Sequence, residues 1–204
     1  MPALAQTIEG TILNRVETGE SHLRISLFSG KNGLKLVLLR IYKRNRSVPP
    51  PDLFDDVEFN VNIPRNGSGL PFVKDFQIIK KRAKVAHHHL RFQIASSLAR
   101  LFLDNGYHLQ DTIPVYQLLL NALSALEAGL DPMTIWLKTL FRFGRNEGLP
   151  VKQDWLANLN RDENQFAIFT LNTPLAEQEP KADKVLNLVH SLRSWLNAET
   201  ELRC

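Results

Sequence analysis

The spacing of apolar residues changes near Lys80, and this change limits the possible folds more than any other feature of the chain. Before Lys80 apolar and polar residues alternate, most clearly in residues 57–63, which read VEFNVNI. Successive side chains of a strand point to opposite faces, so this alternation predicts a strand with one buried and one solvated face. After Lys80 apolar residues recur every three or four positions, which indicates helices. The sequence therefore predicts a sheet followed by helices.

Five short strands are predicted in the first part, at about 7–16, 22–29, 33–41, 57–63 and 71–79. Residues 29–33, which read SGKNG, predict a hairpin turn between the second and third strands. Closing so small a sheet protects its edges, and an OB-type barrel is a common way to arrange five strands in about 80 residues. We therefore predict an OB-fold domain over residues 1–80, although the pattern alone also fits a small SH3-like barrel.

A helical bundle is predicted over residues 81–204, with helices at about 90–105, 114–128, 132–147 and 181–201. Gly106 is expected to end the first helix in a left-handed conformation, and Asp131 to cap the third. Residues 166–171 are predicted as a strand and 173–180 as a loop. The predicted fold class is thus α+β, a five-stranded OB-type β-barrel followed by an α-helical bundle.

Cations are concentrated near the N-terminus, although the net charge of the whole chain is only +4. Residues 10–50 contain only two acidic residues, Glu17 and Glu20, and eight cations: Arg15, Arg24, Lys31, Lys35, Arg40, Lys43, Arg44 and Arg46. In OB barrels the second and third strands commonly bind single-stranded nucleic acid, through cations that contact phosphates and aromatic rings that stack on bases. These eight residues are therefore the candidate nucleic-acid-binding surface. The other interpretation, that they are ordinary solvated charges, stays open.

Two aromatic residues, Phe28 and Tyr42, are candidates for base stacking, and of these we assign Phe28 to the barrel core. Trp136, Phe141 and Phe143 lie among Arg142 and Arg145 on the third helix, which suggests an apolar groove with a basic rim. Such a groove suits a short acidic peptide that ends in an aromatic residue. The candidate partner-binding residues are thus Trp136, Arg142 and Arg145, with core packing as the preferred alternative for Trp136.

No sequence signature of an enzyme is recognisable. Phosphate-binding glycine loops, dinucleotide fingerprints and nucleophile elbows are missing. Adjacent helical residues are turned about 100° from each other, so the run His87 to His89 cannot converge on one metal ion in a continuous helix. The carboxylates Asp52, Asp55 and Asp56 could hold Mg²⁺ in a nuclease, but a loop that enters the fourth strand explains them more simply. We predict no catalytic residues, metal or cofactor.

The signatures of export and of membrane insertion are not recognisable either, and one cysteine, Cys204, cannot form a disulfide within the chain. We therefore expect a cytoplasmic protein without a membrane partner.

A series of short motifs runs along the chain, in residues 9–13, 19–23, 27–29, 33, 43–47, 70–73, 118–132 and 141–150. In their order these motifs resemble those of the bacterial RecO family of DNA recombination and repair mediators. Many RecO proteins have a four-cysteine zinc knuckle beyond the region that corresponds to residue 155, whereas here only Cys204 lies there, so the chain resembles a zinc-free or shortened relative.

The resemblance implies a non-enzymatic protein that binds single- and double-stranded DNA, anneals complementary single strands and assists recombinase loading after DNA damage. It also implies RecR and single-stranded DNA-binding protein as partners, with the acidic tail of the latter in the groove beside Arg142, and a nucleoid-associated location. An OB-fold module that docks proteins without binding DNA is the main alternative, and a metal-dependent nuclease is a second one.

Overall fold

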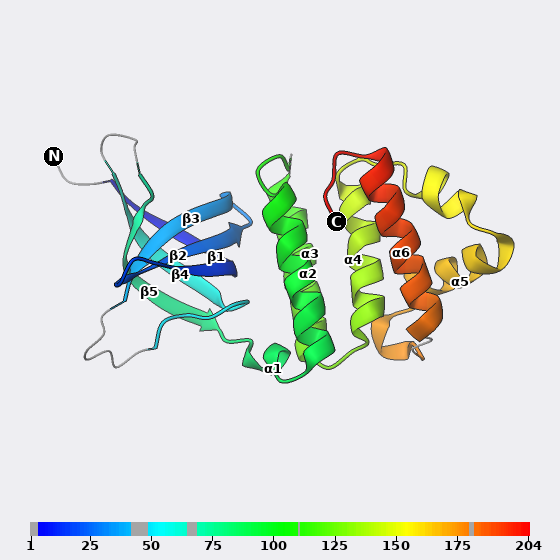
Figure 1. The fold of residues 1–204 in the computed structure, drawn as a ribbon, viewed down its shortest axis with the longest axis horizontal. Helices are drawn as coiled ribbons and strands as arrows, with labels where there is room; N and C mark the ends of the chain where they lie inside the picture. Colours follow the sequence, from blue (N-terminus) through cyan, green and yellow to red (C-terminus); the bar gives the residue numbers. More distant parts are fainter. Residues whose placement is uncertain (1–3, 42–48, 65–68, 110, 180–181) are drawn as a thin grey trace.

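The computed structural model describes residues 4–41, 49–64, 69–109, 111–179 and 182–204, which form a five-stranded barrel followed by a stack of helices (Figure 1). The strands are β1 (Leu4–Thr18), β2 (His22–Ser29), β3 (Gly33–Arg40), β4 (Asp56–Ile63) and β5 (Phe72–Lys80). The α-helices are α1 (Ala83–Ala86), α2 (His89–Asn105), α3 (Thr112–Glu127), α4 (Pro132–Asn146), α5 (Arg161–Asn172) and α6 (Ala182–Glu199). Two short turns of other helix types are η1 (Lys152–Leu156) and η2 (Leu175–Glu177).

The barrel closes in the order β1-β2-β3-β5-β4, with β1 paired to both β2 and β4. All neighbouring strands are antiparallel except β3 and β5, which pair in parallel at Leu38 with Phe72 and at Leu39 with Val73. This arrangement is compatible with an OB fold and confirms the predicted α+β class. The predicted strand positions also agree with β1 to β5 to within a few residues at each end.

Side chains at alternate positions along the strands fill the interior of the barrel. Leu23, Ile25 and Leu27 of β2 are at most 1% exposed, and Val37 and Leu39 of β3 lie opposite Ile25 and Leu23. The side chains between them therefore point away from the barrel interior. This alternation decides which cations share the outside of the sheet.

A second core joins the barrel to the helices. Phe28, which is fully buried, packs edge-on against Phe102 of α2 with 5.3 Å between ring centroids, and Phe102 in turn packs against Phe143 of α4. The assignment of Phe28 to a core is therefore confirmed, although that core lies between the barrel and α2. The three-ring contact fixes the barrel against the helices.

Gly106 was predicted to adopt a left-handed conformation, and this is wrong, because its φ is −62°. The structure gives another reason for a glycine here. A Cβ atom at residue 106 would lie 3.2 Å from the Cβ of Leu34 in β3 and 3.3 Å from the ring of Phe28 in β2. Glycine therefore allows the end of α2 to approach the barrel closely.

The third predicted helix is confirmed as α4, where the Asp131 carboxylate accepts a 2.8 Å hydrogen bond from the backbone N–H of Thr134. The strand predicted at residues 166–171 is wrong, since these residues lie in α5. The Asn160 side chain caps this helix by accepting a 3.0 Å hydrogen bond from the N–H of Glu163. Ala167 and Thr170, three residues apart, are the buried positions of α5, which is helical spacing.

Helix α6 confirms the last predicted helix, with Val185, Leu188 and Leu192 buried and Trp195 only partly buried. Among the described residues, no helix has the length and apolarity needed to cross a membrane.

Candidate functional site

Two of the predicted cations, Arg24 and Arg40, lie on the outside of the barrel. Arg24 is opposite Leu38, and Arg40 is opposite His22 across the β2–β3 ladder. Both arginines are exposed, and their strand neighbours Leu23 and Leu39 point inward. The two guanidinium groups are therefore presented by adjacent strands on the same face of the sheet.

Aromatic and apolar groups lie on the same face. Phe72 of β5, which is 47% exposed, is paired with Leu38, and its ring meets the ring of His22 edge-on at a centroid distance of 6.1 Å. Val16 of β1, which is 39% exposed, is opposite Arg24. We call this surface the outer barrel face, and its residues are Val16, His22, Arg24, Leu38, Arg40 and Phe72.

The outer barrel face combines the two features that bind single-stranded nucleic acid, namely cations for the phosphates and exposed rings for the bases. Arg24 forms no ion pair with any residue that the structure describes. A phosphate would therefore meet a cation that is not already neutralised by a carboxylate.

The structure does not bring the other predicted cations to this face. Arg15 donates a hydrogen bond of 2.9 Å to the Asp52 carboxylate and one of 3.2 Å to the carbonyl of Pro51. Lys35 is exposed, but it is opposite Leu27 and shares the register of Val37 and Leu39, so it is not on the outer barrel face. Lys31 lies in the β2–β3 turn beside α3. Three further predicted cations and one predicted aromatic lie outside the described residues, namely Tyr42, Lys43, Arg44 and Arg46.

The carboxylates Asp55 and Asp56 connect β4 to the chain that leaves the barrel. Asp56 forms a 2.5 Å ion pair with Arg82, whose side chain is only 2% exposed, and accepts a 2.6 Å hydrogen bond from the Thr11 hydroxyl. Asp55 accepts a 3.1 Å hydrogen bond from the backbone N–H of Arg82. These contacts give both carboxylates a structural role at the junction between β5 and α1.

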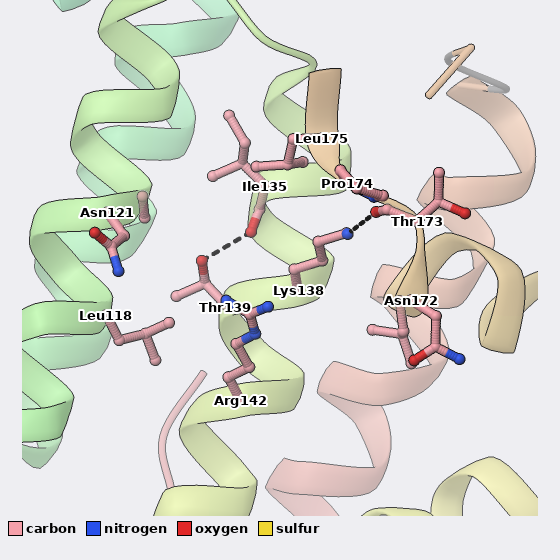
Figure 2. A pocket seen from close by; sticks show the side chains of 12 residues that line it. Leu118, Asn121, Ile135, Lys138, Thr139, Arg142, Asn172, Thr173, Pro174 and Leu175 are labelled. Carbon is pink, nitrogen blue, oxygen red and sulfur yellow. Dashed lines mark hydrogen bonds between the residues drawn. The ribbon is translucent and has the colours of Figure 1, made fainter. Parts of the chain in front are cut away.

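A second candidate site lies in the helical part, on the side of α4 between α3 and the chain around η2 (Figure 2). It is a hollow of about 360 Å³ whose walls include Leu118, Ile135 and Leu175. Lys138 and Arg142 lie one helical turn apart in it, with the amides of Asn121 and Asn172 on either side. We call this hollow the α4 pocket.

Lys138 is the unusual group in the α4 pocket, because it is only 7% exposed. Its ammonium donates a hydrogen bond to the carbonyl of Thr173 (Figure 2), and none of the residues that line the pocket is acidic. Burial lowers the pKa of Lys138, and the positive charge of Arg142 lowers it further. A buried cation without a carboxylate is costly unless an anion joins it, so the α4 pocket favours an anionic ligand.

Arg142 and Arg145 are exposed on α4 and together line two further hollows of about 380 Å³ and 370 Å³ next to the α4 pocket. Trp136 lines none of these hollows and is 3% exposed, so it packs in the helical core. Sequence reasoning missed Lys138, although its position four residues before Arg142 places both on the same side of a helix.

Phe72 was also missed as a site residue. It precedes Val73, which is buried, and two adjacent apolar residues do not reveal which one points outward. Only its pairing with Leu38 of β3 shows the direction of its side chain.

The sequence matches no known family model, and a search of curated proteins found no similar one either.

Proposed function

We propose that this protein is a RecO-like DNA-binding mediator that anneals complementary single strands and assists recombinase loading. The observation that supports this most directly is the outer barrel face, where Arg24 and Arg40 lie on the same side of the sheet as the exposed ring of Phe72. The resemblance to RecO motifs supplies the biological role, and the surface supplies a way to hold a strand.

In this mechanism the arginines neutralise phosphates and release their counterions, which weakens the repulsion between two strands held close together. A base that stacks on the ring of Phe72 keeps its pairing edge exposed, so that a base of the second strand can pair with it. Base pairing then supplies the free energy of annealing, so the protein needs neither a cofactor nor a covalent step.

The partners follow from the same proposal. The α4 pocket, with the cations Lys138 and Arg142 beside apolar walls, suits the acidic tail of single-stranded DNA-binding protein that the RecO resemblance implies. RecR is a further partner by resemblance. The proposal also includes a cytoplasmic, nucleoid-associated location.

The test is fluorescence anisotropy of a labelled single-stranded oligonucleotide at several salt concentrations, with the wild type and with Arg24→Gln/Arg40→Gln. For single strands the slope of log K against log salt is about −0.7 per phosphate contact, so loss of two contacts should make it shallower by about 1.4. Arg100→Gln/Arg161→Gln is the matched control, because it removes two exposed cations from helices instead of the barrel.

An unchanged slope in the barrel variant, or an equal change in the control, would contradict the assignment of the outer barrel face. Absence of oligonucleotide binding by the wild type at low salt would refute the mediator and favour the protein-docking module. The exposed side chains of Val16 and Phe72 would then be an apolar contact surface for a protein.

A further inference from the structure

A groove of about 410 Å³ lies between the barrel and the start of α3, on the outside of β1 and β4. Glu9 and Glu58 form one side of it, and Ile113 and Tyr116 of α3 form another. We call it the α3 groove. It is separate from the outer barrel face and from the α4 pocket, and nothing in the proposed function uses it.

The two glutamates are close together, and no cation among the described residues forms an ion pair with either of them. Glu9 is directly opposite Glu58 in the β1–β4 ladder, which places their Cβ atoms about 4.5–5.5 Å apart. Neither forms an ion pair with any described residue, and Lys31, which also lines the groove, forms none with them. Like charges in direct cross-strand positions destabilise a sheet, so the folded protein alone gains nothing from this pair.

The apolar side of the groove is held in place. Tyr116 packs on the backbone of Gly30, where a Cβ atom would lie 2.9 Å from Cδ1 of the ring. The Thr112 hydroxyl donates a 2.7 Å hydrogen bond to the carbonyl of Gly30, which ties the start of α3 to the β2–β3 turn. Ile113, at 65% exposed, is one of the most exposed large apolar residues described.

The negative charge of Glu9 reaches Tyr116. Burial raises the pKa of the Tyr116 hydroxyl above 10.0, and the charges of Asp56 and Glu9 raise it further. The phenol therefore stays neutral at physiological pH. A neutral aromatic ring beside two carboxylates is a suitable environment for a cation, because the cation can contact the ring face as well as the carboxylates.

We propose that the α3 groove docks a segment of a protein partner that carries an arginine next to an apolar side chain. A guanidinium group is planar and has five N–H donors, so it can hydrogen-bond to Glu9 and Glu58 while it stacks on Tyr116. The neighbouring apolar side chain covers Ile113. Binding relieves the repulsion between the glutamates, which contributes to affinity.

The groove and the outer barrel face can be occupied together. Ser29, in the groove, is five residues from Arg24 along β2, a distance of roughly 17 Å at the usual rise of a strand. The carboxylates of the groove also repel phosphates. The partner therefore does not compete with a nucleic acid strand for the same surface.

The experiment is an NMR titration of the full-length, isotope-labelled protein with the peptide acetyl-Leu-Arg-Leu-amide. We expect saturable shifts at Gly30 and Tyr116, a dissociation constant at least threefold higher for Glu58→Gln, and no saturation for Glu9→Gln/Glu58→Gln. The melting temperature of Glu58→Gln should rise, because the repulsion is removed. Glu17→Gln/Glu20→Gln, which removes two exposed carboxylates from the β1–β2 hairpin, should bind like the wild type.

The proposal is overturned if the double variant still binds the peptide, or if a peptide with glutamate in place of arginine gives the same shifts. A dimer in analytical ultracentrifugation that Glu9→Gln/Glu58→Gln abolishes would also overturn it, since the groove would then bind a second copy of this chain. Oligonucleotide binding by the double variant should not be weakened, which separates this test from that of the outer barrel face.

Discussion

Replacing Lys138 with methionine should raise the free energy of unfolding and at the same time weaken anion binding in the α4 pocket. Lys138 is 7% exposed, and no residue that lines the pocket is acidic. Replacing buried ionic groups by apolar groups of similar volume is often neutral, or stabilising by about 1–4 kcal/mol. Because the substitution also removes a hydrogen bond, we expect a gain at the lower end, about 1 kcal/mol.

The lost hydrogen bond should cost little. The carbonyl of Thr173, which accepts from the Lys138 ammonium, also accepts a 2.7 Å hydrogen bond from the side-chain amide of Gln178. This carbonyl therefore keeps a donor in the variant, and the larger penalty of a buried acceptor without any partner does not arise. Methionine has nearly the length of the lysine stem and fills the same space.

The gain should depend on pH. The pKa of Lys138 in the folded protein lies below the ordinary 10.5, mainly because of burial. Between these two values the unfolded chain binds more protons than the folded protein, so the contribution of Lys138 to stability rises with pH through that window. Below the pKa that Lys138 has in the folded protein, the full free-energy cost of burying its charge is present. The advantage of Lys138→Met should therefore be largest at neutral pH and shrink in alkali.

Urea unfolding at pH 7 and at alkaline pH measures this difference through the transition midpoint at constant m-value. A gain of 1 kcal/mol corresponds to a rise of roughly 2–4 °C in melting temperature for a chain of this size. Lys152→Met is the matched control, because Lys152 is an exposed cation of the neighbouring hollow. A variant less stable than the wild type by 1 kcal/mol or more would refute the view of Lys138 as an uncompensated buried charge.

The same variant tests the pocket. A short acidic peptide that ends in phenylalanine should bind Lys138→Met about 10- to 150-fold more weakly, since hydrogen bonds to charged groups contribute about 1.5–3 kcal/mol. Isothermal titration calorimetry measures both affinities. Equal binding by the two proteins would show that the α4 pocket does not hold the acidic end of the peptide.

Two further predictions concern the barrel. Phe72→Ala should weaken the binding of a single-stranded oligonucleotide by about 1–3 kcal/mol, the usual contribution of one stacked base, and fluorescence anisotropy measures this loss. The melting temperature should change little, because the ring is 47% exposed, and thermal unfolding checks this. Asp56→Asn should lower the free energy of unfolding in urea by roughly 3 kcal/mol, because it leaves the buried guanidinium of Arg82 without its carboxylate. A loss below about 1 kcal/mol would contradict the importance of this ion pair.

The sequence predicted the barrel well because apolar and polar residues alternate with the period of a strand, most regularly in β4, where Val57, Phe59 and Val61 are the buried positions. It failed at α5, where Phe166, Ile168 and Leu171 resemble a strand, while the burial of Ala167 and Thr170 is helical. Ala167 is small and Thr170 is polar, so neither marks the buried side of the helix in the sequence.

The candidate sites depended on information that the sequence lacks. Eight cations were predicted as one surface, but the β2–β3 register divides them, with Arg24 and Arg40 on the outer barrel face and Lys35 in the other register of β3. The sequence alone does not show how two strands are aligned, and a shift of that alignment by one residue moves every side chain to the other face of the sheet. Lys138 was missed for a similar reason, since its burial depends on α5 and η2, which follow it in the chain.

The arrangement of the two candidate sites bears on the proposed mediator. Helices α2 and α3 lie between the barrel and the layer of α4 and α6 (Figure 1), and the rings of Phe28, Phe102 and Phe143 connect the three layers through one core. The outer barrel face and the α4 pocket therefore belong to different layers of one packed unit. In the proposed function a DNA strand on the barrel and an acidic protein tail in the pocket would use different cations, so neither ligand would displace the other. In this proposal the protein holds the tail of single-stranded DNA-binding protein while it binds the DNA strand that this partner releases. No conformational change between the barrel and the helices is needed.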